Sequence, residues 1–232
     1  MNHPQTIGRA TGVLFLITYI TSIPAFFILY APVRLDPDYI VGAGADTSVI
    51  LGAFLELLLI IANIASAVVP FAILRLQNEI LALGFLTARI VESVFIAVGL
   101  LSLLTVVTLR QEAAGADPGS LVLVGQSLVA LQGWTFLLGP GFVVGIGNGL
   151  ILGYLMYTSR LIPRYLAVLG LIAGPLLIVS GVAMLFGVIE QGGVVQSIAT
   201  IPEFIWELAL GIWLTVRGFN RSAIARLEGE SG

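Results

Sequence analysis

Hydrophobic residues fall along the chain in six long runs that are separated by shorter polar segments. An apolar run of about 18 residues or more is long enough to cross a bilayer as a helix. A helix is required because an open strand would leave its backbone groups unpaired in hydrocarbon. The pattern therefore predicts an all-α fold, a polytopic membrane helix bundle with six transmembrane helices. The expected spans are 11–31, 48–74, 80–109, 136–157, 165–188 and 195–216.

The first run is predicted to be a retained helix. Its apolar part is about 20 residues long, whereas a signal peptide has about 7–15, and no clear small-x-small cleavage site follows it. We therefore expect residues 1–232 to form a single integral membrane domain.

The segment 118–135 is apolar enough to be considered as a seventh span. Asp117-Pro118 is a good start for a helix, but Gly139-Pro140-Gly141 leaves almost no loop before the next span. Three polar side chains also interrupt the apolar pattern, at Gln126, Ser127 and Gln132. These features favour a short interfacial helix over residues 118–135, with seven spans as the alternative.

Composition excludes several classes of protein. Hydrophobic residues make up 58 % of the chain and charged residues 10 %, whereas a soluble domain carries about 25 % charge. An ordinary soluble enzyme, a disordered chain and a nucleic-acid binder are therefore excluded. There is no cysteine, the one histidine is His3, and every basic residue is arginine. We expect no metal site, no cofactor and no catalytic residues from this inventory.

The arginines predict the orientation, because cytoplasmic loops of membrane proteins carry an excess of basic residues. With six spans, seven arginines lie on one side and two on the other. The larger group is Arg9, Arg75, Arg160, Arg164, Arg217, Arg221 and Arg226, and the smaller is Arg34 and Arg110. Both termini are then cytoplasmic. Seven spans would again divide the arginines seven against two, so this bias does not decide the span number.

Four glycines recur at intervals of four residues along the fourth span. They are Gly141, Gly145, Gly149 and Gly153. Such a stripe of small residues lets two helix backbones approach closely. We interpret it as a helix-packing surface, whose partner is either another helix of this chain or a second copy.

Five charged residues are predicted to lie within the membrane. They are Glu56, Arg89, Glu92, Glu203 and Glu207. Arg89 lies nine residues into the third span and Glu207 nine residues from the end of the sixth, so both lie about 14 Å from the cytoplasmic side. Glu92 and Glu203 lie about one turn deeper. If these two spans touch, one guanidinium meets three carboxylates.

The remaining polar residues extend this predicted site. Asn63 and Ser66 form a polar line with Glu56 on the second span, and Asn148 lies near the middle of the fourth. One arginine cannot neutralise four carboxylates, and isolated buried anions are costly. The surplus acids are therefore expected to be protonated, or to be balanced by a cation or substrate.

Several short stretches, taken together, resemble a known family. They are Gly12-Val13-Leu14-Phe15-Leu16-Ile17, Ala82-Leu83-Gly84, Arg89-Ile90-Val91-Glu92, the run from Gly153 to Leu166 with Arg160-Leu161-Ile162-Pro163-Arg164, Glu207-Leu208, Trp213-Leu214 and Gly218-Phe219. Their order resembles the bacterial membrane family called domain of unknown function 4386 over essentially the whole chain. The resemblance implies a multi-helix integral membrane protein and no defined activity.

These observations favour a small permease-like or sensor protein of the bacterial cytoplasmic (inner) membrane, with an intramembrane Arg/Glu site as the substrate or proton site. The alternatives are a structural or assembly protein, whose charges only fix helix packing, and a membrane-embedded enzyme. Arg160 and Arg164 are predicted membrane-interface anchors. Besides the lipid bilayer, a second copy or another membrane protein is the candidate partner. The sequence does not identify a ligand.

Overall fold

The computed structural model describes residues 4–42, 44–112 and 115–230, and all regular secondary structure within them is helical. His3 lies outside the described residues. The elements in chain order are α1 (Pro4–Pro24), η1 (Ala25–Leu29), α2 (Ala31–Leu35), α3 (Asp46–Gln77), α4 (Glu79–Glu112), α5 (Pro118–Phe136), η2 (Leu137–Val143), η3 (Gly145–Leu152), α6 (Gly153–Ser159), α7 (Arg164–Leu185), α8 (Val194–Arg217) and α9 (Arg221–Glu230). The three η elements are turns of wider, π-helical backbone.

Six helices in the described part of the chain are long and apolar enough to cross a membrane, which confirms the predicted membrane bundle. Elements that follow one another without a break count here as one helix. The six are Pro4–Leu29, Asp46–Gln77, Glu79–Glu112, Pro118–Ser159, Arg164–Leu185 and Val194–Arg217. The last has the lowest mean hydropathy, 1.3, because it carries Glu203 and Glu207.

The expectation of a separate interfacial helix over residues 118–135 is wrong. This segment is the first part of a continuous helix of 42 residues, Pro118–Ser159. Pro140 has no N–H group and its ring conflicts with the preceding turn, but the backbone widens there and does not break. The Val144 N–H donates to the Gly139 carbonyl five residues earlier, the spacing of a π-helix. The seven-span alternative fails for the same reason.

This long helix begins at Asp117-Pro118, where the sequence predicted a helix start. Asp117 is its N-cap, and its side chain accepts hydrogen bonds of 2.9 Å from both the backbone N–H and the hydroxyl of Ser120. These two bonds lower the pKa of Asp117. Pro118, which needs no partner for an N–H group, occupies the first turn.

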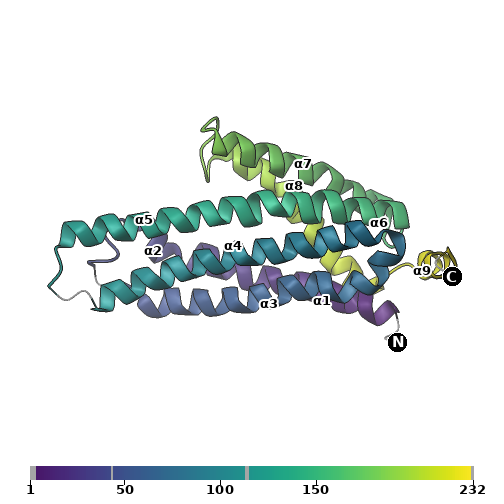
Figure 1. Ribbon diagram of the computed structural model, residues 1–232, viewed down its shortest axis with the longest axis horizontal. Helices are drawn as coiled ribbons and strands as arrows, with labels where there is room; N and C mark the ends of the chain where they lie inside the picture. The colour runs from purple at the N-terminus through teal and green to yellow at the C-terminus, as the bar shows by residue number, and fades with distance from the viewer. Residues whose placement is uncertain (1–3, 43, 113–114, 231–232) are drawn as a thin grey trace.

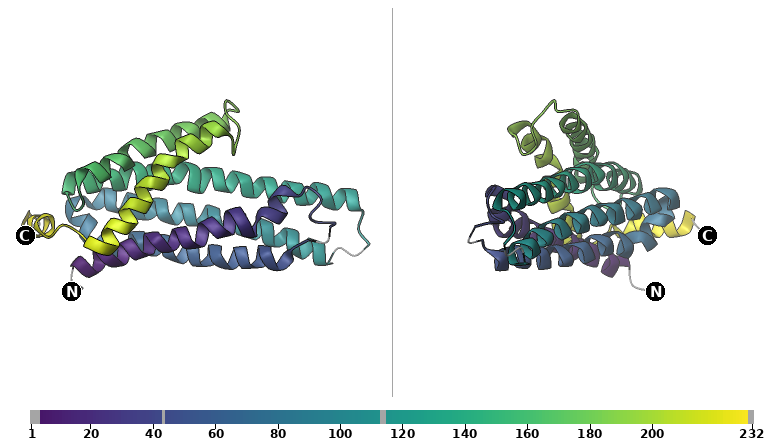
Figure 2. Two further views of the ribbon diagram at one scale, coloured as in Figure 1. Left: turned by 180° about the vertical axis from the view of Figure 1, so that it is seen from behind. Right: turned by 60° about the vertical axis from the view of Figure 1, so that its left-hand side comes forward.

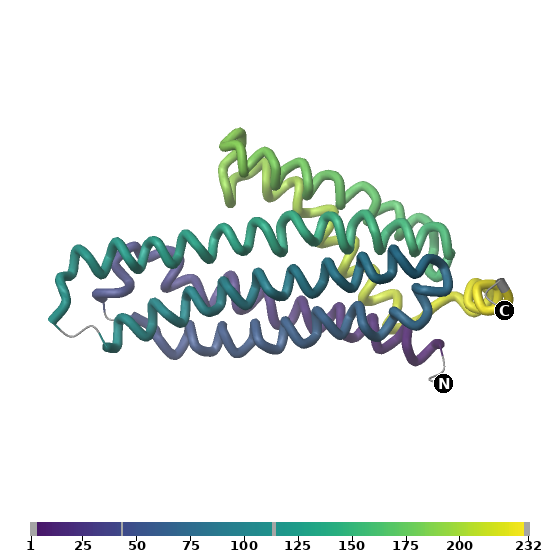
Figure 3. Tube along the Cα trace, in the orientation of Figure 1, coloured from purple at the N-terminus to yellow at the C-terminus, as the bar shows by residue number. Residues whose placement is uncertain are grey.

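The helices form an elongated bundle. α3 packs on α1 and α4, α4 packs on α5, and α8 packs on α1 and α7. The α7–α8 pair inclines away from the other helices toward its connecting turn, and α3, α4 and α5 extend beyond that turn (Figures 1 and 2). The chain path in Figure 3 places the start of α1 and the whole of α9 at the same end of the bundle.

Two apolar clusters lie toward opposite ends of the bundle. The first includes Leu74 of α3, Phe85 of α4 and Trp206 of α8. The second includes Val49 of α3 and Leu103 of α4. Along both α3 and α4, buried polar residues fall between the positions that belong to these clusters. The fold therefore encloses a polar layer within an otherwise apolar interior.

Three glycines of the predicted stripe pack against α7 within the same chain. A β-carbon at Gly145 would lie 2.9 Å from the Gly174 carbonyl oxygen, and one at Gly153 would lie 3.2 Å from the Leu171 nitrogen. A β-carbon at Gly149 would collide with the Gly174 backbone. Gly141 differs, since its nearest neighbours belong to its own helix. The close contact is thus an internal one between η3–α6 and α7.

This contact predicts the effect of a single added methyl group. Gly149→Ala should lower the free energy of unfolding by about 1–3 kcal/mol, because α7 must move away. Unfolding of the purified protein by SDS in mixed micelles, followed by tryptophan fluorescence, measures the change. Gly84→Ala is the matched control, since its β-carbon would lie 3.4 Å from the Ile151 Cδ1 atom. It should be neutral or stabilising by about 0.5–1 kcal/mol. Equal stability of the two variants would contradict the tight contact.

Candidate functional site

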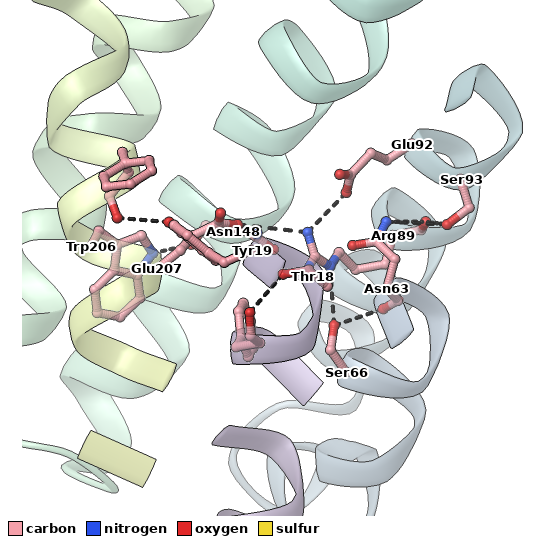
Figure 4. Close-up of polar contacts among 12 residues, drawn as sticks. Thr18, Tyr19, Asn63, Ser66, Arg89, Glu92, Ser93, Asn148, Trp206 and Glu207 are labelled. Atoms are coloured by element: carbon pink, nitrogen blue, oxygen red, sulfur yellow. Dashed lines mark hydrogen bonds and ion pairs between the residues drawn. The ribbon is translucent and has the colours of Figure 1, made fainter. Parts of the chain in front are cut away.

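Arg89 is the centre of the polar layer and is only 2 % exposed. Its Nη1 atom donates to Glu92 Oε2 at 2.9 Å and lies 3.7 Å from Glu207 Oε1. Glu92 lies one turn along the same helix, whereas Glu207 comes from α8. Figure 4 shows the guanidinium between these two carboxylates. The structure thus brings together three of the five charged residues that the sequence predicted, across α4 and α8.

Hydrogen bonds to α3 and within α4 hold the arginine in place. Its Nε donates to Ser66 Oγ at 3.2 Å, and Ser66 in turn donates to the Asn63 carbonyl at 2.6 Å. Asn63 Nδ2 donates to Ser93 Oγ at 3.1 Å, and Ser93 donates to the Arg89 carbonyl at 2.8 Å. A guanidinium fixed through both Nε and Nη1 has little freedom to leave the carboxylates.

The opposite side of the site is built by η3 and α8. Asn148 Nδ2 donates to Glu207 Oε1, and the Asn148 carbonyl accepts a 3.1 Å hydrogen bond from Trp206 Nε1. Both Asn148 and Trp206 are fully buried. Glu207 is therefore held between Asn148 and Arg89, so its carboxylate is oriented by two different helices (Figure 4).

Glu203 does not join the ion pairs. Its residue is 3 % exposed, and neither carboxylate oxygen has a hydrogen-bond partner among the described residues. A β-carbon at Gly149 would lie 3.2 Å from Glu203 Oε2, so the carboxylate lies next to the bare backbone of η3. The predicted contact of Arg89 with three carboxylates is reduced to two, and the third remains buried without a partner.

Glu56 has a separate partner. The hydroxyl of Tyr30 donates to Glu56 Oε2 at 2.8 Å, and both residues are buried. Tyr30 lies directly after η1, where the first membrane helix ends. Glu56 is therefore tied to the first helix and does not contact the arginine.

A central cavity of about 190 Å³ connects all these groups. Its wall includes the Arg89 guanidinium and the carboxylates of Glu56, Glu92, Glu203 and Glu207. The other polar lining residues are Thr18, Tyr19, Ser22, Asn63, Gln132, Thr135 and Thr200. Because carboxylates outnumber basic groups around this small cavity, it can hold a proton, a small cation or a cationic group of a ligand. No group of three His, Cys, Asp or Glu residues in the described chain is arranged to hold a metal ion.

The predicted interface anchors lie away from this cavity. Arg160 follows α6 and Arg164 begins α7, and both are exposed at the end of the bundle where α9 lies. They contribute nothing to the central site.

Similarity to a known family extends over most of the chain. A family described as a domain of unknown function, DUF4386, matches residues 10–218. The chain belongs to the DUF4386 family. No curated protein and no solved structure matches it. Membership in DUF4386 is what the resemblance implied, and it assigns no activity.

Residues that the sequence analysis did not identify complete the site of this DUF4386 protein. Tyr30, Ser93 and Trp206 all bond to predicted site residues. Phe15 lies with its ring 5.2 Å from the guanidinium carbon of Arg89. Aromatic and hydroxyl side chains are common in membrane helices, so their type and spacing carried no signal. Only the pairing of helices distant in sequence shows their role.

Removing the arginine tests the ion pairs. Arg89→Ala should lower the free energy of unfolding by about 3–5 kcal/mol, because Glu92 would be left as an uncompensated buried charge and Glu207 as a partly buried one. SDS unfolding in mixed micelles measures this loss. Arg75→Ala removes an exposed arginine of α3 and should change stability by about 0.5 kcal/mol or less. A loss below about 1 kcal/mol in Arg89→Ala would show that the ion pairs do not stabilise the bundle.

Proposed function

We propose that this protein is a small permease-like carrier whose central cavity takes up a proton or a small cation on its surplus carboxylates. The observation that carries the proposal is Glu203, a carboxylate that is buried, lines the cavity and has no hydrogen-bond partner among the described residues. A side chain that only fixed helix packing would be expected to have a partner, since a buried polar group without one costs stability.

The charges around the cavity support the same proposal. Arg89 supplies one positive charge and contacts Glu92 and Glu207. Glu203 and Glu56 have no basic residue within ion-pair distance in the described structure. An unbalanced anion in a low-dielectric setting binds a proton or a cation strongly. Glu203 is therefore the proposed uptake group, because Arg89 is paired with Glu92 and Glu207 and does not reach it.

The position of Glu203 in α8 also fits a carrier. It follows Pro202, which removes one backbone hydrogen bond from the helix. α7 and α8 incline together away from the other helices toward their connecting turn (Figure 2), and Pro202 lies in the half of α8 nearer that turn. A weakened turn next to the proposed uptake group would allow the helix to bend there.

A structural role is the second candidate. The observation that favours it is the network in which Arg89 joins α3, α4 and α8 through Ser66, Glu92 and Glu207. Such a network can fix helix register without binding anything. It accounts for the arginine and two glutamates, but it gives no role to Glu203.

The proposal includes the cellular setting. Seven of the arginines are grouped on one side of the six spans, and this side is proposed to be cytoplasmic in the bacterial inner membrane. Both ends of the described chain would then be cytoplasmic. We also propose that the protein associates with a second copy or with another membrane protein, and the mass of the purified complex in detergent would distinguish these from a monomer.

Replacing the proposed uptake group tests the carrier. In liposomes that hold a pH-sensitive dye, an imposed membrane potential should drive proton entry through the wild type. Glu203→Gln keeps the shape of the side chain and removes its charge, so proton flux should fall at least about tenfold while the melting temperature stays level or rises. Glu207→Gln should lower both flux and stability, because its ion pair with Arg89 is lost.

Glu79→Gln is the control, since Glu79 is exposed at the start of α4. It should leave flux and stability unchanged. Unchanged proton flux in Glu203→Gln would contradict the carrier. A wild type without proton flux, combined with a lowered melting temperature in Glu207→Gln, would support the structural role.

A further inference from the structure

A second cavity, of about 510 Å³, lies at the end of the bundle where α9 lies, well apart from the central site. Three arginines line it and none of its lining residues is acidic. Its floor is apolar. The lining residues are Arg160, Leu161, Ile162, Pro163, Arg164, Trp213, Arg217, Gly218, Phe219 and Asn220.

Three helix ends place the three arginines around this cavity. Arg160 follows the last residue of α6, Arg164 is the first residue of α7 and Arg217 is the last residue of α8. Asn220 joins the two loops, because its N–H donates to the Leu161 carbonyl at 2.8 Å. The backbone positions of the three arginines are therefore set by helix ends.

The backbone at Arg160 is unusual. Its φ of 58° and ψ of 28° lie in the left-handed region, and it is the one residue other than glycine with a positive φ in the described chain. Glycine is the usual residue at such a helix end, since it adopts this conformation without a steric cost. An arginine held there against that preference points to a role for its side chain.

No acidic residue of the described chain forms an ion pair with these three arginines. Arg160 and Arg217 are exposed and make no ion pair with any described residue. Arg164 lies over the ring of Tyr157 at 4.8 Å, a contact that leaves its charge uncompensated. Three such groups around one cavity can donate to the several oxygen acceptors of a phosphate group and compensate its negative charge.

We propose that this cavity, defined by Arg160, Arg164 and Arg217, binds the phosphate of an anionic phospholipid headgroup. A lipid is favoured over a free phosphate compound because Trp213 and the exposed Tyr165 lie at the same end of the bundle. Tryptophan and tyrosine are typical of the level of the headgroups. The apolar floor of Leu161, Ile162 and Phe219 suits the glycerol and upper acyl carbons.

A simpler role for these arginines is to favour one orientation in the membrane and to interact with helix carboxyl ends. That role requires only positive charge. The proposal requires in addition a saturable site that prefers an anionic lipid, and the two roles therefore differ in a measurable way.

Arg160→Gly separates the side chain from the backbone. Glycine suits the left-handed conformation, so the variant should melt at the same temperature as the wild type or higher. In neutral detergent, native mass spectrometry with added dioleoyl-phosphatidylglycerol counts the bound lipid. The wild type should bind one such lipid at least about tenfold more tightly than Arg160→Gly, and than the second variant, Arg217→Gln.

Arg75→Gln removes an exposed arginine of the same predicted side that does not line the cavity. It should bind phosphatidylglycerol within about twofold of the wild type. Phosphatidylcholine, which has a phosphate but no net charge, should bind more weakly. Equal lipid binding by the wild type and both cavity variants would overturn the proposal. Displacement of the lipid by millimolar inorganic phosphate would overturn it too, by assigning the cavity to free phosphate.

Discussion

A guanidinium within a membrane protein needs carboxylates in reach, and this requirement joins distant parts of the chain. Arg89 on α4 lies 3.7 Å from Glu207 on α8, more than one hundred residues later. The same arginine donates to Ser66 on α3. Because the charge is 2 % exposed, α3, α4 and α8 must keep these positions to hold it. The arrangement of the bundle thus depends on a polar contact at its centre, although its surface and most of its interior are apolar.

The apolar clusters on either side make this polar layer possible. They enclose it along α3 and α4, and close backbone contacts such as Gly149 with Gly174 bring η3 against α7. The absence of a side chain at Gly149 also leaves room beside Glu203. One glycine therefore serves both the helix contact and the space beside the Glu203 carboxylate. A larger side chain at Gly149 would therefore disturb both the contact with α7 and the surroundings of the Glu203 carboxylate.

Hydropathy predicted the number and nature of the spans, because long apolar runs have few alternatives in a bilayer. It failed at Gly139-Pro140-Gly141, where local rules favour a break. A π-helical turn there keeps the helix continuous. The depth of charged residues correctly placed Arg89 beside Glu207, but depth alone does not give the rotation of a helix about its axis. Glu203 was expected at the guanidinium for that reason, and the structure places it next to Gly149 instead.

The residues that line the two cavities carry opposite net charge, so the charge differs between the centre of the bundle and one of its ends. The central cavity has four carboxylates and one arginine, and the cavity at the α9 end has three arginines and no acid among its lining residues. A cation is attracted by the first and repelled by the second, since the sign of the lining charge decides which ions accumulate. If an anionic lipid headgroup occupies the second cavity, it reduces that repulsion at one end of the bundle. Lipid composition would then affect the approach of a cation to Glu203 without any contact between the two sites.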